Sequence, residues 1–218
     1  MGRQRLRPSA MTITDCHTHL EAEGAVVNVS PRYFAPVEGH CYSVGIHPWD
    51  LAEADEELWQ CLVEAATSPH VVALGETGLD ALKGPSLDVQ QRWFERHVAL
   101  SEELQKPLII HCVKAHHLIL ALHAHLRPTQ PWVMHGFRGK PALAQQLLDA
   151  GLYLSLGPRF NEETARLIPD DCLLFESDDS GLPIDDVAAR LASVRGIPPS
   201  VLLTHSTRTT TALFALSQ

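Results

Sequence analysis

Short apolar segments recur along this chain with amphipathic segments between them, and this alternation restricts the possible folds more than any other feature. Eight of the apolar segments have the length and the residue types of β-strands. Continuous apolar runs such as PLIIHC and DCLLFES are typical of parallel strands that are buried on both faces. The expected strands are Thr12–Cys16, Ala25–Val29, Cys41–Ile46, Val71–Glu76, Pro107–Cys112, Pro131–His135, Leu152–Leu156 and Cys172–Ser177.

Helices are expected in most of the intervals between these strands. Pro141 suits the first turn of a helix, while Gly151 and Gly196 stand where the end of a helix favours glycine. Eight strands that alternate with helices predict an α/β fold of the (β/α)8 type, a TIM-like barrel. The expected helices are Glu53–Thr67, Leu87–Leu104, His116–Leu126, Pro141–Ala150, Glu162–Leu167, Ile184–Val194 and Ser206–Leu216.

The beginning of the barrel is expected to be irregular. About eight residues separate the first two expected strands, and about eleven separate the next two. A crossover between parallel strands that includes a full helix needs about a dozen residues or more. We therefore expect the first two helices to be shortened or missing, and we expect no long helix between Leu20 and His40.

Length and composition favour a single cytoplasmic domain. The chain has 218 residues, of which 45% are hydrophobic, and this is enough for one barrel with a sizeable core. Residues 1–10 contain arginines but no apolar run, so they do not resemble a secretory signal. The five cysteines show no CxxC spacing, which favours reduced thiols. We expect a disordered extension over residues 1–11 and a single barrel domain over residues 12–218.

Composition also disfavours two classes of partner. No apolar segment reaches about 18 residues, so we expect no transmembrane helix and no membrane partner. The net charge of −9 is unlike that of proteins that bind nucleic acid over an extended basic surface. A small nuclease site remains compatible with this charge, because bound metal ions supply positive charge locally. No segment indicates a protein partner.

Side chains that commonly bind metal ions stand at the ends of six expected strands, and the active sites of barrel enzymes lie at that end. In an extended strand His17 and His19 point to the same side and can bind one ion together. Imidazole and carboxylate ligands suit Zn²⁺, Mn²⁺, Ni²⁺ or Fe²⁺ better than Mg²⁺. A carboxylate such as Glu76 can bridge two ions, so we expect two divalent metal ions. The candidate ligands are His17, His19, Glu76, His111, His135 and Asp178.

The motifs at these strand ends resemble those of the TatD-like metal-dependent deoxyribonucleases, a family within the amidohydrolase-like barrels. The resemblance extends from Asp15 to about Phe214. It rests on DCHTHL at 15–20, GIHPW at 45–49, GETGLD at 75–80, LIIHC at 108–112, MHGF at 134–137 and ESD at 176–178. It implies a phosphodiester substrate such as DNA. It also implies a first ion on His17, His19 and Asp178, a bridging Glu76, and a second ion on His111 and His135.

The chain departs from the family's pattern near the expected substrate site. After Asp178, the segment DSGLP leads directly into an expected helix, where the family usually has a longer loop with a basic motif. Lys114 stands near a position at which the family often has arginine. These departures leave the candidate ligands intact and leave the identity of the substrate open.

Hydrolysis by a metal-activated water is the expected reaction. Asp178 and Glu76 are the catalytic candidates: Asp178 acts either as the general base or only as a ligand, and Glu76 acts as the bridge between ions. Lys114 is expected either to bind a substrate phosphate or to be solvated. His47 is expected to contact the substrate or to support a ligand, and Asp80 to support a ligand.

Three functions remain compatible with these residues. The first is a phosphodiesterase or deoxyribonuclease that acts on DNA or a small phosphodiester. The second is a hydrolase of a small-molecule ester, amide or phosphate at the same site, and the third is a non-catalytic metal-binding protein. Glu76 stands where classical amidohydrolases often carry a carboxylated lysine, which disfavours that branch. The presence of all six candidate ligands disfavours the non-catalytic alternative.

Overall fold

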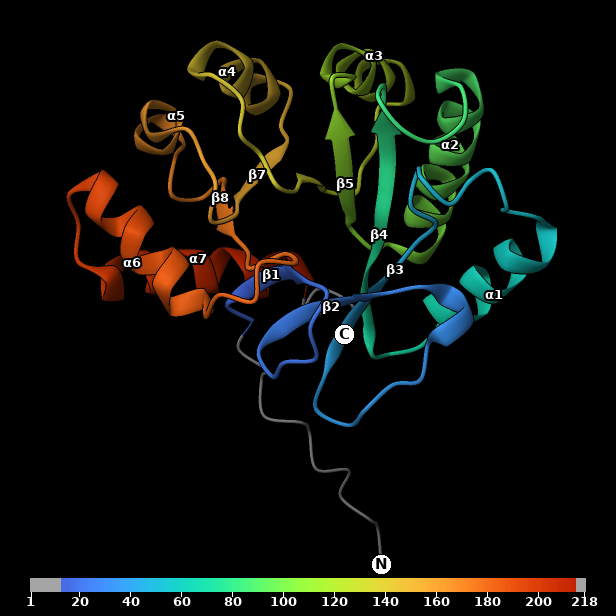
Figure 1. The fold of residues 1–218 in the computed structure, drawn as a ribbon, viewed down its shortest axis with the longest axis horizontal. Coiled ribbons are helices and arrows are strands. Elements are labelled where there is room, and N and C mark those ends of the chain that lie inside the picture. The colour runs from blue at the N-terminus through green and yellow to red at the C-terminus, as the bar shows by residue number, and fades with distance from the viewer. Residues whose placement is uncertain (1–12, 215–218) are drawn as a thin grey trace, which may run out of the picture.

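The computed structural model describes residues 13–214, whose eight strands form one parallel sheet that curves into a barrel (Figure 1). Each strand pairs with the next in sequence order, from β1 to β8. This order is that of a (β/α)8 barrel and confirms the predicted fold class. The strands are β1 Asp15–Thr18, β2 Ala25–Val29, β3 Cys41–Val44, β4 Val71–Asp80, β5 Leu108–Val113, β6 Trp132–Met134, β7 Tyr153–Leu156 and β8 Leu173–Phe175.

Hydrogen bonds between β1 and the segment after β8 close the barrel. The backbone N–H of Asp178 donates to the carbonyl of His17 at 3.1 Å, and the N–H of His19 donates to the carbonyl of Asp178 at 3.2 Å. Thr18 and Asp178 also form an isolated parallel bridge. Closure of the barrel therefore brings Asp178 beside two histidines that lie far from it in the sequence.

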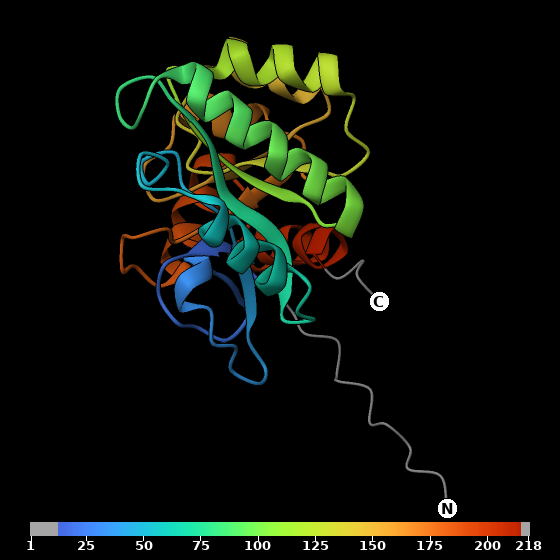
Figure 2. The ribbon, with the colours of Figure 1, turned by 90° about the vertical axis from the view of Figure 1, so that its right-hand side faces the viewer.

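Helices cover the outside of the barrel, and Figure 2 shows α2 and α3 lying along its outer surface. Between β2 and β3 the chain forms only the 3-10 helix η1, Pro31–Tyr33. The prediction that the first two helices are shortened or missing is therefore confirmed, because residues 20–40 are all described and contain no longer helix. The helices are α1 Glu56–Ala66, α2 Leu87–Leu104, α3 His116–Leu126, α4 Pro141–Asp149, α5 Glu162–Leu167, α6 Ile184–Arg195 and α7 Pro199–Phe214.

The bounds of several elements differ from prediction, and the differences are largest for β4 and α7. β4 continues to Asp80, past its predicted end at Glu76, because it keeps pairing with β5 beyond a register shift. α7 begins at Pro199 instead of Ser206, and its buried face mixes leucines with Ser206 and Thr210, which weakened the apolar periodicity. The predicted extension 1–11, the predicted start of the first strand and the predicted end of the last helix lie outside the described residues.

Alternate residues of β5, β6 and β8 enter two separate cores. Ile109, Val133 and Leu174 point into the barrel and belong to its inner core, together with Leu213 and Phe214 of α7. Their neighbours along the strands pack against the surrounding helices and belong to the outer core. This alternation decides which polar side chains enter the mouth of the barrel.

Two further observations bear on the environment of the protein. All five cysteines lie in the described part of the chain and carry free thiols. Within residues 13–214, no helix is both long enough and apolar enough to cross a membrane.

Candidate metal centre

The inner face of the barrel continues from apolar to polar residues at the ends of β5, β6 and β8. His111, His135 and Glu176 each lie two positions after an inner-core residue, namely Ile109, Val133 and Leu174. Because side chains two apart on a strand share a face, these three polar residues point into the mouth of the barrel. The predicted ligands His111 and His135 thus stand directly above the inner core, together with Glu176.

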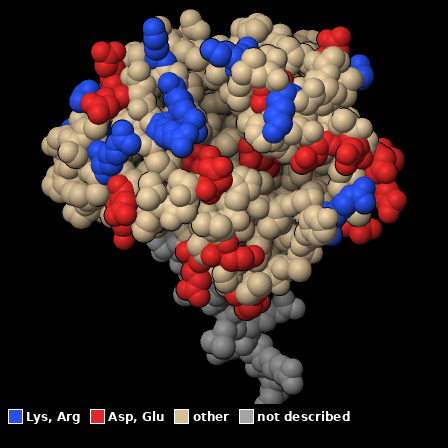
Figure 3. All heavy atoms as spheres, viewed as in Figure 1, with Lys and Arg blue, Asp and Glu red and all other residues tan. Residues whose placement is uncertain are grey.

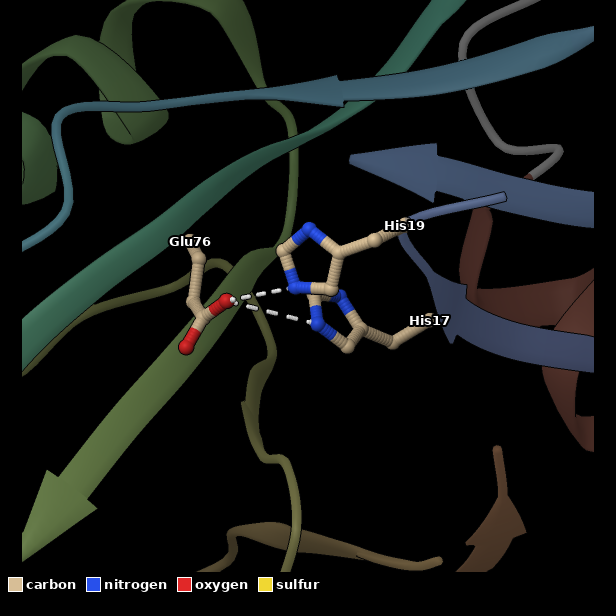
Figure 4. A group of neighbouring side chains, drawn as sticks. All are labelled: His17, His19 and Glu76. Atoms are coloured by element: carbon tan, nitrogen blue, oxygen red, sulfur yellow. Dashed lines mark ion pairs between the residues drawn. The ribbon is translucent and has the colours of Figure 1, made fainter. Parts of the chain in front are cut away.

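Glu76 lies at the centre of the polar cluster. Its Oε2 atom is 3.4 Å from Nε2 of His17 and 3.4 Å from Nε2 of His19, and Figure 4 shows both rings pointing toward this carboxylate. Its Oε1 atom is 2.7 Å from Nε2 of His135 and 2.8 Å from Nδ1 of His111. The two oxygens of Glu76 therefore face two different sets of histidines.

Asp178 completes the set of six predicted ligands, five of which line one cavity, while the sixth, the buried His17, lies beside Glu76 and Asp178. Its Oδ1 atom lies 3.7 Å from Nε2 of His17 and 3.7 Å from Nε2 of His19. The residue has a positive φ of 54°, a conformation that aspartate tolerates better than most residues. Its side chain is 20% exposed against 5% for Glu76, so Asp178 is the more accessible carboxylate to water.

Three overlapping groups of side chains have the spacing of metal ligands, with ligand atoms within 4.8 Å of one another. Both ring nitrogens of the buried His17 lack a hydrogen-bond partner among the described residues. Buried polar atoms are normally paired, so these nitrogens and the surrounding carboxylates fit a divalent cation. The groups are His17, His19 and Glu76; His17, His135 and Asp178; and His47, Glu76 and His111.

His47 lies beside a candidate ligand and on the wall of the cavity, a position compatible with both of its predicted roles. Its Nε2 atom is 3.1 Å from Oε1 of Glu76, and its ring centroid is 4.5 Å from that of His111. It can therefore orient Glu76 or act as a ligand itself, and it also lines the cavity where a substrate would bind. Lys114, the other predicted substrate-binding residue, lines the same cavity.

The protonation of the cluster reflects its crowded charges. Burial opposes the ionisation of Glu76, but the rings of His135 and His111 outweigh it and hold the pKa of Glu76 well below its usual range. Burial likewise opposes the protonation of His135, but the carboxylates of Glu76 and Glu176 raise the pKa of His135 well above its usual value. A cation that binds here would replace protons held between histidines and carboxylates.

Glu176 supports His135 from beneath, and the sequence analysis assigned it no role. Its side chain is fully buried. Its Oε1 atom lies 3.3 Å from Nδ1 of His135 and accepts the N–H of Gly136 at 2.7 Å, while Oε2 accepts the hydroxyl of Ser155. This contact favours a hydrogen on Nδ1 and leaves Nε2 of His135 to face Glu76.

Asn28, Asp15 and Asp80 support the other ligands. The Oδ1 atom of Asn28 accepts the backbone N–H of Glu76 at 2.8 Å. Asp15 accepts the N–H of His17 at 3.2 Å, and burial raises the pKa of Asp15 to about 6. Asp80 lies 3.2 Å from Nε2 of His111, in the supporting place predicted for it. Asn28 is the one polar residue of the segment AVVNV, a signal that the sequence analysis passed over.

The cavity above the cluster has a volume of about 1540 Å³ and is open to solvent. Its lining includes the side chains of Lys114, Arg138 and Arg159, with Asp50 and Asp179 among the acids. Figure 3 shows this hollowed face, on which basic and acidic groups alternate. The arrangement combines several cations around the opening with a carboxylate and imidazole cluster at its base.

A family model and curated relatives of this chain point to the same protein family. Residues 33–215 match the family described as TatD related DNase. The "3'-5' ssDNA/RNA exonuclease TatD" of Citrobacter koseri is 33% identical over 207 residues, 87% of this chain and 75% of that protein. The protein of the same name from Citrobacter rodentium is 35% identical over 176 residues, 73% of this chain. That alignment spans 65% of the relative's length.

Solved structures show the same fold at lower sequence identity. The crystal structure of YJJV, a TatD homologue from Escherichia coli, superposes with a TM-score of 0.84 at 20% identity and covers 95% of this chain and 99% of that one. A TatD family hydrolase from Entamoeba histolytica gives 0.71 at 18% identity, covering 80% of this chain and 74% of that one.

Proposed function

Because the chain belongs to the TatD related DNase family, we propose that it is a metal-dependent hydrolase that cleaves phosphodiester bonds of single-stranded nucleic acid. The observation that carries this proposal is the position of Glu76, whose two oxygens face two sets of histidines. Such a carboxylate is suited to bridge two divalent cations.

We assign the ligands of the two ions from this geometry and from the family pattern. His17, His19 and Asp178 would hold the first ion, and Glu76 would bridge through its two oxygens. His111 and His135 would hold the second ion, and His47 lies near enough to Glu76 to assist it. The imidazole-rich set favours Zn²⁺, with Mn²⁺, Ni²⁺, Fe²⁺ and Mg²⁺ as alternatives. Bound here, such ions would acidify a water molecule and neutralise negative charge on the phosphoryl group.

The protein's own groups supply the proton transfer and the orientation of the substrate. Asp178 accepts the proton of the attacking water, because it is the more exposed of the two catalytic carboxylates. Lys114 lines the cavity and binds a non-bridging phosphate oxygen as a point charge. Asn28 holds the backbone of Glu76, so the bridging carboxylate keeps its position.

The cellular setting follows as part of the same proposal. The free thiols support a cytoplasmic location.

The family match over residues 33–215 supports a single hydrolase domain over residues 12–218. A small phosphodiester is the second candidate substrate, because a net charge of −9 gives little attraction for a long strand outside the cavity.

The test combines metal analysis with substrate choice. Metal content is measured on purified protein, which is then stripped and reloaded with each candidate ion. Activity is assayed on labelled single-stranded DNA, bis(p-nitrophenyl) phosphate and p-nitrophenyl acetate. We expect metal-dependent cleavage of both phosphodiesters, lost in His135→Ala and retained in His125→Ala, a change of an exposed histidine on α3. Cleavage of the acetate alone would reject the phosphodiesterase in favour of a carboxylic ester hydrolase.

A further inference from the structure

Trp49 is a large aromatic side chain at the cavity for which the proposed reaction gives no role. It follows His47 by two residues in the loop after β3, and 43% of its surface is exposed. Its ring nevertheless has a fixed orientation. The indole N–H donates to Oδ2 of the buried Asp80 at 2.7 Å, and the backbone N–H donates to Nδ1 of His47 at 3.2 Å. A partly exposed ring is thus held by a buried carboxylate.

The ring lies beside the candidate ligands. Its centroid is 4.7 Å from that of His47 and 5.7 Å from that of His111. Both histidines contact Oε1 of Glu76, at 3.1 and 2.8 Å. Trp49 and Glu76 also line the same cavity. A flat group stacked on Trp49 would therefore be the immediate neighbour of a phosphodiester bound at the metal centre.

Lys83 places a positive charge against this ring. Its Nζ atom lies 3.3 Å from the centroid of Trp49. Among the described residues, no carboxylate forms an ion pair with this ammonium. An exposed cation–π contact is weaker than the stacking of a nucleobase on the same ring. A base can therefore displace the ammonium from the ring, which leaves Lys83 free to contact a phosphate.

Buried side chains hold the loop that carries Lys83. Oδ1 of Asp80 accepts the N–H groups of Leu82 and Lys83 at 2.8 and 3.1 Å. The amide of Gln90, also buried, donates to the carbonyl of Lys83 at 3.1 Å. Asp80 thus fixes both the indole of Trp49 and the backbone of Lys83. The pair is pre-organised, which lowers the entropic cost of binding a ligand there.

We propose that Trp49 and Lys83 form a nucleotide subsite of this hydrolase. A nucleobase adjacent to the scissile phosphodiester stacks on Trp49, and Lys83 contacts a neighbouring phosphate. This inference rests on the proposed phosphodiesterase function and adds that the site recognises the nucleoside part of its substrate. Aromatic stacking together with a cation is the combination by which proteins bind single-stranded nucleic acid without reading its sequence.

The first test separates the ring from its hydrogen bond. Trp49→Leu and Trp49→Phe both lose the bond to Asp80, but only Trp49→Leu loses the aromatic ring. The metal-loaded enzyme is assayed on a thymidine trinucleotide and on its analogue without bases. We expect KM for the trinucleotide to be roughly 5- to 150-fold higher in Trp49→Leu than in Trp49→Phe, which is the range for the loss of one stacked base. Its KM for the analogue should stay within about twofold of that of Trp49→Phe.

Two results would overturn the stacking role. If the leucine and phenylalanine variants lose the same activity on both substrates, Trp49 acts only through Asp80. If Trp49→Leu leaves KM for the trinucleotide unchanged, no base binds the ring.

The second test concerns Lys83 and the phosphate. Lys83→Met keeps the aliphatic stem and removes the charge, and Lys140→Met makes the same change at an exposed lysine that does not contact the ring of Trp49. Oligothymidylate binding is measured at several salt concentrations. Lys83→Met should weaken binding and lower the slope of log K against log salt by about one, while Lys140→Met matches the wild type. An unchanged slope in Lys83→Met would show that Lys83 does not contact a phosphate.

Fluorescence distinguishes failure of the subsite from failure of the proposed function. Oligothymidylate added to the metal-free protein should quench the tryptophan fluorescence of Trp49. The Trp49→Phe variant lacks this indole and should not show that component of the quenching. If the wild type cleaves no phosphodiester but shows this quenching, the proposed function fails and the subsite stands. If it cleaves phosphodiesters without this quenching, and cleaves the baseless analogue equally well, the subsite is overturned.

Discussion

Replacing Glu176 with glutamine should weaken metal binding without disrupting the fold. Glutamine has nearly the same shape, and its amide oxygen can still accept the N–H groups of Gly136 and His135. Its NH₂ group would face Ser155, whose hydroxyl can rotate from donor to acceptor. The hydrogen-bond count is therefore nearly preserved, and what disappears is the negative charge beneath His135.

The expected size of this effect follows from the single ligand that Glu176 contacts. Loss of a partner that orients a metal-binding histidine typically costs 10- to 100-fold in metal affinity, or about 1.4 to 2.8 kcal/mol. Because glutamine keeps an acceptor at His135, we expect Glu176→Gln to lower metal affinity about tenfold. Glu176→Ala removes that acceptor and should approach hundredfold, if the variant folds.

The assay is competition for Zn²⁺ against a chromophoric chelator, with thermal unfolding of the metal-free protein measured in parallel. Glu64→Gln, on the exposed face of α1, is the matched control and should bind Zn²⁺ like the wild type. The tautomer of His135, read from its imidazole ¹⁵N shifts, should keep its preference for Nδ1–H in Glu176→Gln and lose it in Glu176→Ala. A Zn²⁺ affinity of Glu176→Gln within twofold of the wild type would refute the reasoning, even if the melting temperature fell.

Two further predictions concern pH and catalysis. Burial lowers the pKa of His97 to about 4, and its neutral ring accepts the N–H of Ile46. Between pH 6.5 and 4, His97 is therefore protonated in the unfolded chain and neutral in the folded chain. As the pH falls through this range, the free energy of unfolding decreases by about 1.4 kcal/mol per pH unit. Urea unfolding at pH 7.5 and 5 should show a smaller loss in His97→Gln than in the wild type; equal losses would contradict this account. Asp178→Asn should lower turnover about a hundredfold or more without rescue by excess Mn²⁺ or Zn²⁺, whereas His135→Ala should be partly rescued. Full rescue of Asp178→Asn would make Asp178 a ligand only.

Local periodicity in the sequence determined much of the fold. The helices Leu87–Leu104, His116–Leu126 and Glu162–Leu167 have the predicted bounds, because their apolar spacing and end signals lie within the segments themselves. The short intervals around β2 predicted the missing helices for an equally local reason, the length needed for a crossover. The six candidate ligands were identifiable because barrel topology gathers the ends of all strands at one opening.

Only the tertiary structure decided which groups support those ligands. Glu176 reaches His135, Asn28 reaches the backbone of Glu76, and Asp80 reaches Trp49 across different strands and loops. These pairings depend on strand register and on the closure of β1 against the segment after β8. The apolar spacing within a single segment predicts neither of them. A strand's own pattern specifies which side chains face inward. The partner that each meets there is set by residues that arrive from elsewhere in the chain once the barrel has closed.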